Sequence, residues 1–577
     1  MRLRSLILLA ISCLATEFTD ALTECKNPPP GMQKMVRGVD ITKLDLLPLE
    51  IVGNNGLKSP VLSLTCAENK LWRNDKSVEY QLPDQVWHMT TVPGGWLSAD
   101  VEIYKSYAAV RKMMAYNVGG EGTLWKFAFS MSYSYQKMQN VITNTSKYIS
   151  DTSSFESATR VDLNPGWVLE LDKYAKLYIN TTITGSVESD ESAYNKFIEE
   201  FGTHYFAIGN FGGYIRLLTE TDISFFENLT ETDAQRSIKA SFQNSISFKA
   251  GTEKKTTSIS QSFEDSSKKT IKYYGGDTNL LRASSVDEWQ PTVDKDPWLY
   301  SGQLKPISDL ITDETKKASM KKAVENHVTK NYLYELERLI STARAKSDDV
   351  VISELQVKVN DLRKVKLLGE EEVDKLKEEI EAEFLVPAWF SSNVNFCFKW
   401  RADGDRGQCG DKVPNLLCAK VNLKTQAYKD NTDKRGGGCQ MQWGIQASGH
   451  RPAWFNDVKL CYKWSADGDS GQCGGGADKL LCAGINEYTQ AYRDDTDGRQ
   501  GGCQMSWMLQ VPEKAPLWIR TTKMCLSWYP DGDSGQCSPH SPRDLCAAAN
   551  NWTEFYLDNT DNRGGGCRMS WGMISTF

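Results

Sequence analysis

Twelve cysteines recur with a fixed spacing in the last third of the chain. The intervals within each set of four are 12, 9 and 21 residues, and each set follows the previous one by 64 residues. Thiols spaced so regularly in an oxidising compartment form disulfides, so the pattern predicts three copies of one small disulfide-stapled β unit. Four cysteines allow three pairings, and spacing does not choose among them. The sets are Cys397, Cys409, Cys418 and Cys439; Cys461, Cys473, Cys482 and Cys503; and Cys525, Cys537, Cys546 and Cys567.

Carboxylates recur with the same period. Asp-Gly-Asp stands at 403–405, 467–469 and 531–533, and a Thr-Asp pair at 432–433, 496–497 and 560–561. Clustered carboxylate oxygens are ligands for calcium, but Asp and Gly are also the residues that β-turns prefer. We expect turns and no cofactor, with calcium at these motifs as the alternative. Zinc at the cysteines is disfavoured by the oxidising compartment.

The sequence contains no arrangement of side chains that is typical of an enzyme active site. The five histidines are scattered, and the sequence holds no HExxH, GxSxG or phosphate-binding loop. His204 has no acid or nucleophile at suitable spacing, so a structural role is expected. The net charge of −7 disfavours a protein that coats nucleic acid. We therefore expect neither an enzyme nor a nucleic-acid partner.

The N-terminus carries the signals of secretion. Arg2 and Arg4 precede the apolar run Leu6 to Leu14, which predicts a signal peptide over residues 1–21. The run is too short to span a bilayer, which needs about 20 residues. Glycosylation sequons begin at Asn144, Asn180, Asn228 and Asn551, and the secretory route predicts glycans at the last three.

Helical and repeat segments define the expected organisation. Residues 308–344 and 347–384 have helical composition and periodicity, with a break at Gly369. Pro-Ala-Trp-Phe at 387–390 recurs at 452–455 and marks a repeat boundary. The prediction is a domain over 22–340, a helical linker over 341–386, and repeats over 387–450, 451–514 and 515–577.

Two stretches of the first domain alternate between large apolar and polar residues. Period two predicts β-strands, either half-buried in an ordinary sheet or able to cross a bilayer within a barrel. The large residues are Trp125, Phe127, Phe129, Met131 and Tyr133 in the first stretch, and Ala240, Phe242, Ile246, Phe248, Ile259 and Phe263 in the second.

An amphipathic helix precedes a recognisable motif. Tyr194, Phe197, Ile198 and Phe201 lie on one helical face that ends at Gly202. Tyr194 followed by Phe201-Gly202-Thr203-His204-Tyr205 resembles in full the signature of the membrane attack complex/perforin (MACPF) family. Two glycine pairs also resemble that family's pattern, namely Gly212-Gly213 and Gly275-Gly276.

The resemblance implies a fold and a mechanism. The fold is α+β, with a bent antiparallel sheet flanked by two helical clusters. Soluble monomers bind target-membrane lipids and self-associate into a ring. Each cluster then unfurls into an amphipathic hairpin of a shared barrel, here from segments 136–160 and 238–272. The glycine pairs would let the sheet change its bend. This describes a secreted pore-forming toxin or defence effector; the alternative is a non-lytic storage, adhesion or carrier protein.

Three further expectations follow from this resemblance and from the layout. A glycan on an inserting hairpin would have to cross the bilayer, so Asn144 is predicted to be unglycosylated. The resemblance also implies a lectin-like light chain joined by a disulfide, with Cys25 and Cys397 as candidate cysteines. Trp389, Trp454 and Trp518 are either membrane anchors or, the favoured interpretation, contacts that pack one repeat on the next.

Overall fold

The computed structural model describes residues 24–575 except for a set of internal gaps. The residues outside the description are 52, 92–99, 121, 146, 227–228, 248–262, 284–285, 348, 405–408, 411–413, 432–436, 469–472, 474–478, 496–500, 533–542 and 560–564. The chain divides into two compact units, each described by itself below. The first comprises residues 1–338 and 358–375, and the second comprises 339–357 and 376–577.

The first unit is built on an eight-stranded antiparallel sheet. Its two longest strands, β7 (Lys147–Leu163) and β8 (His204–Asp222), pair along most of their length. The path runs β2-β1-β8-β7-β5; β10 and β9 pair with opposite ends of β8, and β6 pairs with β7. The shorter strands are β1 (Arg37–Val39), β2 (Leu57–Pro60), β5 (Val86–Thr90), β6 (Asp100–Tyr104), β9 (Ser267–Tyr274) and β10 (Trp298–Pro306).

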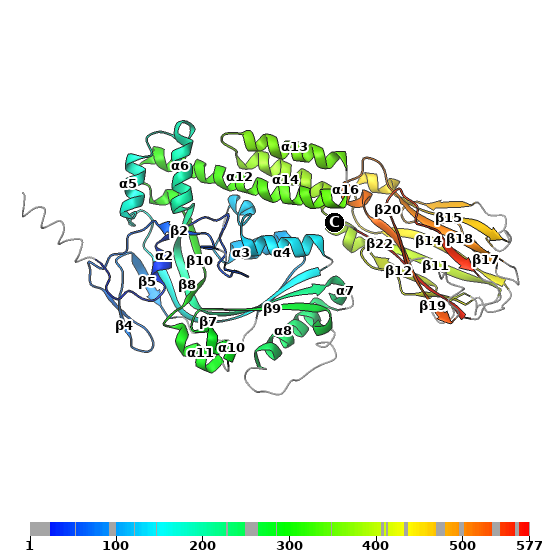
Figure 1. The fold of residues 1–577 in the computed structure, drawn as a ribbon, viewed down its shortest axis with the longest axis horizontal. Coiled ribbons are helices and arrows are strands. Elements are labelled where there is room, and N and C mark those ends of the chain that lie inside the picture. Colours follow the sequence, from blue (N-terminus) through cyan, green and yellow to red (C-terminus); the bar gives the residue numbers. More distant parts are fainter. Residues whose placement is uncertain are drawn as a thin grey trace, which may run out of the picture. The chain divides into compact units, whose positions relative to one another are not determined.

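Two helical groups cover opposite faces of this sheet (Figure 1). The first helical group links β6 to β7, and the second links β8 to β9. Val101 and Ile103 of β6 face the second group, whereas Arg216 of β8 faces the first. The first group is α3 (Tyr107–Tyr116), η1 (Leu124–Phe127) and α4 (Tyr133–Asn144); the second is α7 (Ile223–Phe226) and α8 (Glu231–Ser247).

Both predicted amphipathic strands are helical in this structure. Trp125 and Phe127 lie in η1, Phe129 and Met131 in the turn that follows, and Tyr133 begins α4. Ala240, Phe242 and Ile246 lie in α8, and Phe263 is buried beyond it; Phe248 and Ile259 lie outside the described residues. The strand predictions are therefore wrong for this form of the chain, because the tertiary contacts that bury one face of each helix outweigh the period-two pattern.

The segment 136–160 also needs correction. Its first part is α4, but residues from Lys147 onward already belong to the sheet as β7. Residues 267–272 of the second segment likewise belong to β9. Within each predicted segment, therefore, only the helical part lies outside the strands of the sheet.

The remaining helices agree with the sequence pattern. The signature helix α6 (Val187–Phe201) ends at Phe201, as predicted. The two helical stretches and the break at Gly369 are confirmed by the long helix α12 and by α13 and α14. The bounds are α2 (Met32–Met35), α5 (Lys173–Thr181), α10 (Thr278–Ala283), α11 (Val286–Val293), η2 (Ile307–Leu310), α12 (Glu314–Lys346), α13 (Val350–Lys364) and α14 (Glu370–Phe384).

A separate hairpin pairs β3 (Leu71–Arg73) with β4 (Glu79–Gln81).

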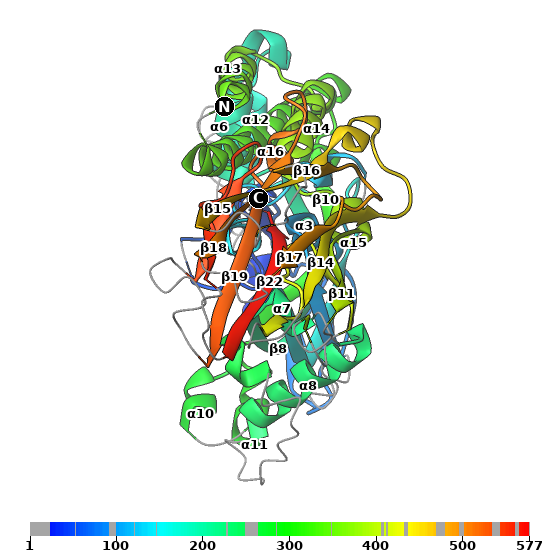
Figure 2. The ribbon, with the colours of Figure 1, turned by 90° about the vertical axis from the view of Figure 1, so that its right-hand side faces the viewer.

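The three repeats of the second unit exchange strands in a closed cycle. Each forms a four-stranded sheet whose last strand comes from another repeat: the first takes β17, the second takes β21, and the third takes β13 from the first. Figure 2 shows β19 and β22 side by side in the third sheet. The strands are β11 (Val394–Gly404), β12 (Leu416–Lys420), β13 (Tyr428–Asn431), β14 (Gly437–Ala447), β15 (Lys459–Gly468), β16 (Leu480–Ala483), β17 (Tyr492–Asp495), β18 (Gly501–Gln510), β19 (Lys523–Gly532), β20 (Asp544–Ala548), β21 (Tyr556–Asn559) and β22 (Gly565–Ile574).

Tryptophans join the three sheets at two levels. Trp443, Trp507 and Trp571 are buried, and their ring centroids lie 5.9–6.0 Å apart. Trp389, Trp454 and Trp518 pack edge to face at 5.9–6.5 Å and lie in the short helices α15 (Ala388–Asn393), η4 (Ala453–Asp457) and α16 (Leu517–Arg520). The interpretation that the latter three pack one repeat on the next is confirmed.

Candidate functional site: two helical groups on one sheet

The signature residues clasp three elements together. Gly202 ends α6 with φ +85°, and a Cβ there would lie 2.7 Å from the backbone of Val39 in β1. The Thr203 hydroxyl donates to the Val39 carbonyl at 2.9 Å and accepts the Ile41 N–H at 3.1 Å. Tyr194 donates to the Gly185 carbonyl at 3.0 Å, and the Phe201 ring packs at a tilt against the Phe197 ring, while Tyr205 is buried. The motif therefore fixes α6 and β1 to the start of β8.

His204 is a neutral, buried member of this clasp. Its Nδ1 lies 2.9 Å from the Thr203 hydroxyl oxygen. Because that hydroxyl already donates to Val39, Nδ1 must carry the proton and donate. Burial lowers the pKa of His204 to about 4, against a weaker opposite effect of Asp40. The expected structural role is therefore the one the geometry supports.

The glycine pairs lie near Trp289, one pair within β8 and the other directly after β9. A Cβ on Gly213 would meet the Trp289 ring at 2.4 Å, and Trp289 Nε1 donates to the Gly275 carbonyl at 2.9 Å. Gly275 and Gly276 both have positive φ, and Gly212 pairs with Trp298 of β10. These glycines allow α11 to approach the sheet, which is a packing reason for them; a change of bend stays a prediction.

The first helical group is held by a buried ion pair. Glu335 of α12 is fully buried and pairs with Arg111 of α3. The same carboxylate accepts from Tyr135 Oη at 2.9 Å and from Gln139 Nε2 at 3.1 Å, both on α4. Sequence patterns gave no signal for this network, because Glu335 lies more than 190 residues from each of its three partners.

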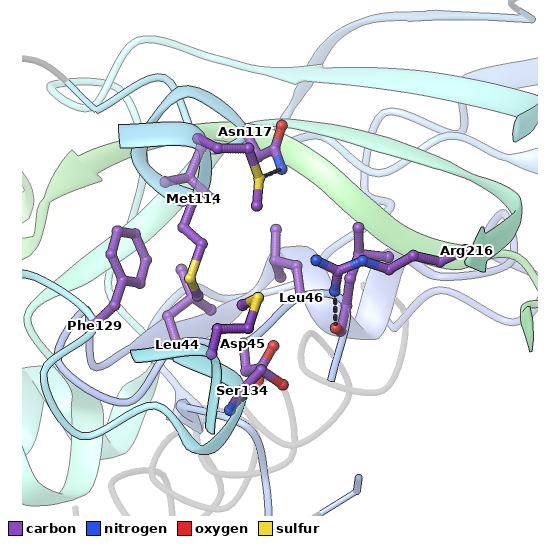
Figure 3. Close-up of a pocket in the computed structure, with 12 residues that line it drawn as sticks. Leu44, Asp45, Leu46, Met114, Asn117, Phe129, Ser134 and Arg216 are labelled. Atoms are coloured by element: carbon purple, nitrogen blue, oxygen red, sulfur yellow. Dashed lines mark hydrogen bonds between the residues drawn. The ribbon is translucent and has the colours of Figure 1, made fainter. Parts of the chain in front are cut away.

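A small cavity lies beneath the same group. It is lined by the 44–47 segment, by α3 and α4, and by Arg216, and Figure 3 shows Arg216 bonded to the Leu47 carbonyl. Asp45 borders it and accepts the Ser134 N–H at 3.2 Å. Burial raises the pKa of Asp45, although the Ser134 hydrogen bond opposes the rise. Arg216 is itself paired with Asp151 at 2.7 Å.

The second helical group rests on apolar contacts. Phe242 packs with Ile215, Leu217 and Trp289, and Ile238 packs with Phe225 and Phe263. The ion pair of α8 with Lys105 is long, at 3.9 Å, and both partners are exposed. In the described part of this group, no ion pair is buried as the Arg111–Glu335 pair is.

The sheet has two outer strands of opposite charge. In the described chain, β6 pairs only with β7 and β9 only with β8, so each has one open edge. Asp100 and Glu102 project from β6, and Lys268 and Lys272 from β9, on the same face of the sheet. The sequence search missed these residues, because only the strand pairing identifies them as edge residues.

The cysteines are paired within the chain. The first two repeats join first to third and second to fourth cysteine, as in Cys397–Cys418 and Cys409–Cys439, and the third repeat joins its first cysteine to its third, Cys525–Cys546. Cys25 pairs with Cys66. The expectation that Cys25 or Cys397 bridges to a partner is therefore wrong for this structure, since both are already bonded. All thirteen described cysteines are disulfide-bonded, and Cys537 lies outside the described residues.

The predicted glycosylation sites and the repeated aspartate motifs lie only partly within the described residues. Asn180 and Asn551 are exposed, Asn144 ends α4, and Asn228 lies outside the described residues, so glycosylation stays a prediction. Asp405, Asp469 and Asp533 and the Thr-Asp pairs also lie outside them. No group of metal-ligating side chains gathers among the residues described. None of the described helices is both long and apolar enough to cross a membrane.

Comparison with known proteins gives one family. Residues 29–337 match the MAC/Perforin domain. The chain is 34% identical over 574 residues to the perivitellin-2 67 kDa subunit of Pomacea maculata and 33% identical to that of Pomacea canaliculata, covering 99% of this chain and 98% of each subunit. The crystal structure of GNIP1Aa from Chromobacterium piscinae aligns with a TM-score of 0.41 and 11% identity, over 93% of this chain and 83% of that one.

The layout predicted from the sequence, a MACPF domain followed by three repeats, resembles the heavy chain of perivitellin-2, and the full-length identity confirms that resemblance. The chain belongs to the MAC/perforin (MACPF) family.

Proposed function

We propose that this protein is a secreted, non-enzymatic pore-forming toxin or defence effector. It binds target-membrane lipids, self-associates into a ring through its sheet edges, and converts the two helical groups into hairpins of a transmembrane barrel. One observation carries the proposal: each helical group interrupts a pair of neighbouring antiparallel strands, β6–β7 and β8–β9. Extending those strands through the helical segments gives two hairpins per copy without changing the sheet order.

The open edges support self-association. Asp100, Ser153, Arg216 and Lys272 lie at one level across the four strands. When a second copy adds its β9 to β6 without a shift in level, Asp100 faces Lys272, and Glu102 lies diagonally between Lys268 and Lys272. Opposite charges in these positions stabilise neighbouring strands. A closed ring also removes the open edges that lipid does not tolerate.

A charge exchange tests this assembly. Asp100→Lys with Glu102→Lys places lysines at both edges of one copy, and Lys268→Glu with Lys272→Glu places acids at both. Each variant alone should repel itself and show at least tenfold less cross-linked oligomer on phosphatidylcholine–cholesterol–glycolipid vesicles, whereas an equal mixture should assemble. Glu68→Lys with Glu79→Lys, on exposed positions near the β3–β4 hairpin, is the matched control. No loss for either variant, or no rescue on mixing, contradicts the edge contact.

Conductance across a planar bilayer tests the function itself. The natively purified protein, with any partner retained, should give discrete and stable steps of nanosiemens size. A silent bilayer across several lipid compositions would favour the alternative, a non-lytic egg storage or adhesion protein that binds through its repeats or through a lectin partner. That alternative draws on the relatives; the two cysteines expected to join a light chain, Cys25 and Cys397, are paired within this chain.

A further inference from the structure

We propose that Glu335 is a latch which holds the first helical group on the domain, so that the second group detaches first. What the order of detachment achieves depends on the proposed function, pore formation. The latch itself is a property of the soluble chain. Its four members come from three helices of the first unit: Arg111 from α3, Tyr135 and Gln139 from α4, and Glu335 from α12.

One carboxylate holds both helices of the first group. Arg111, Tyr135 and Gln139 all donate to Glu335, whose side chain is 0% exposed; that of Arg111 is 7% exposed. The guanidinium of Arg111 also donates to the Lys126 carbonyl, which ties in the segment between α3 and α4. Because α12 lies outside the chain between β6 and β7, neither helix can leave the sheet without breaking contacts to this carboxylate.

The surroundings keep the pair dry and aligned. The Arg111 guanidinium lies 4.6 Å from the ring centre of Tyr135 and 4.9 Å from that of Tyr332. Two further contacts reinforce the attachment: Arg338 donates to the Ser130 carbonyl at 2.7 Å, and Lys126 pairs with Asp374 at 2.7 Å. Charged hydrogen bonds in a dry setting depend steeply on geometry, so the attachment breaks as a unit.

The second group has no ion pair as deeply buried as Arg111–Glu335 in its described part. Its apolar side chains pack on the sheet, and Ser241 of α8 donates to Glu264, whose carboxylate pairs with Lys269 of β9. The side chains of that pair are 33% and 21% exposed, so it is partly solvated. Apolar contacts weaken gradually as a helix moves, whereas separating a buried ion pair leaves two uncompensated charges. The two groups therefore differ in how they are released, and α8 should open at the lower free energy.

Hydrogen exchange of the soluble protein tests the latch without a membrane. Amides of 107–116 and 133–144 should be protected at least about tenfold more than those of 231–247. Glu335→Gln keeps the side-chain shape but removes the charge, and should lower protection of the first group on the order of 100-fold while leaving 231–247 unchanged. Equal protection of both groups in the native protein would overturn the proposal.

The matched control lies on the same helix. Glu337 pairs with Arg363 of α13 at 3.1 Å, outside the chain between β6 and β7, so Glu337→Gln should leave the exchange of the first group unchanged. If Glu335→Gln prevents folding, Tyr135→Phe removes a single donor and should still lower protection selectively. A Glu335→Gln or Tyr135→Phe protein that folds with first-group exchange unchanged would also overturn the proposal. A chain that forms no pores yet shows these exchange differences would reject the proposed function and retain the latch.

Discussion

At the residue scale, the signature of the family acts as a structural clasp. Thr203 satisfies Val39 and Ile41 of the neighbouring segment, and Gly202 supplies the left-handed turn that brings α6 against β1. The motif identifies the family because this junction accepts few side chains. Its histidine, His204, is buried with its pKa lowered to about 4 and contacts the Thr203 hydroxyl, so it is part of the packing at this junction.

The pKa of His204 makes a stability prediction. Its folded value of about 4 lies below the ordinary 6.5, so the unfolded chain binds the proton more readily between these values. The neutral, buried His204 therefore contributes about 3 kcal/mol to the free energy of unfolding above pH 6.5, and this contribution is lost as the pH falls toward 4. Chemical unfolding of wild type and His204→Gln at pH 7 and pH 4 measures how much the free energy of unfolding of each protein falls with pH. The same fall in both proteins would contradict the assignment of a buried neutral imidazole.

A repeated threonine gives a second prediction. Thr425, Thr489 and Thr553 recur every 64 residues, and each hydroxyl accepts the backbone N–H of a tryptophan in another repeat. Thr489→Val keeps the shape but leaves the Trp443 N–H unsatisfied, which should lower the free energy of unfolding by about 1–3 kcal/mol. Urea denaturation of the full chain measures it. Thr312→Val, at an exposed threonine before α12, is the control and should have little effect.

At the element scale, local signals were sufficient for some parts of the fold and insufficient for others. The helix that ends at Phe201, the break at Gly369 and the tripling of the repeats were all predicted, because periodicity or spacing encodes each locally. The period-two stretch at 125–135 was misread. Buried partners from α12 decide its conformation, as Tyr135 bonded to Glu335 shows, and no local pattern contains that contact.

The exchange of strands among the repeats could also not be predicted from the sequence. Three nearly equivalent repeats offer the same pairing surface to one another, so spacing cannot tell a strand's own sheet from the next. The open edges of β6 and β9, and hence the charged residues proposed for assembly, likewise become visible only when the pairing is known.

At the scale of the whole molecule, the cyclic exchange makes the repeats one folding unit. Deleting residues 515–577 removes β19–β22, which leaves β13 without a sheet and takes β21 from the second sheet. We expect the truncated chain to lose cooperative unfolding of the remaining repeats and to be cut by thermolysin within 394–514. A protease-resistant fragment of the first two repeats would contradict this prediction.

The central claim is that the second helical group becomes a strand in lipid, and environment-sensitive labels along 239–247 test it most directly. All described cysteines are disulfide-bonded, so single introduced cysteines can be labelled one by one. In solution, fluorescence should follow the helical period of α8. On membranes, positions 240, 242 and 246 should enter an apolar environment while 239, 241, 243 and 245 stay in water. A helical period that persists on membranes under conditions that produce conductance would contradict the account.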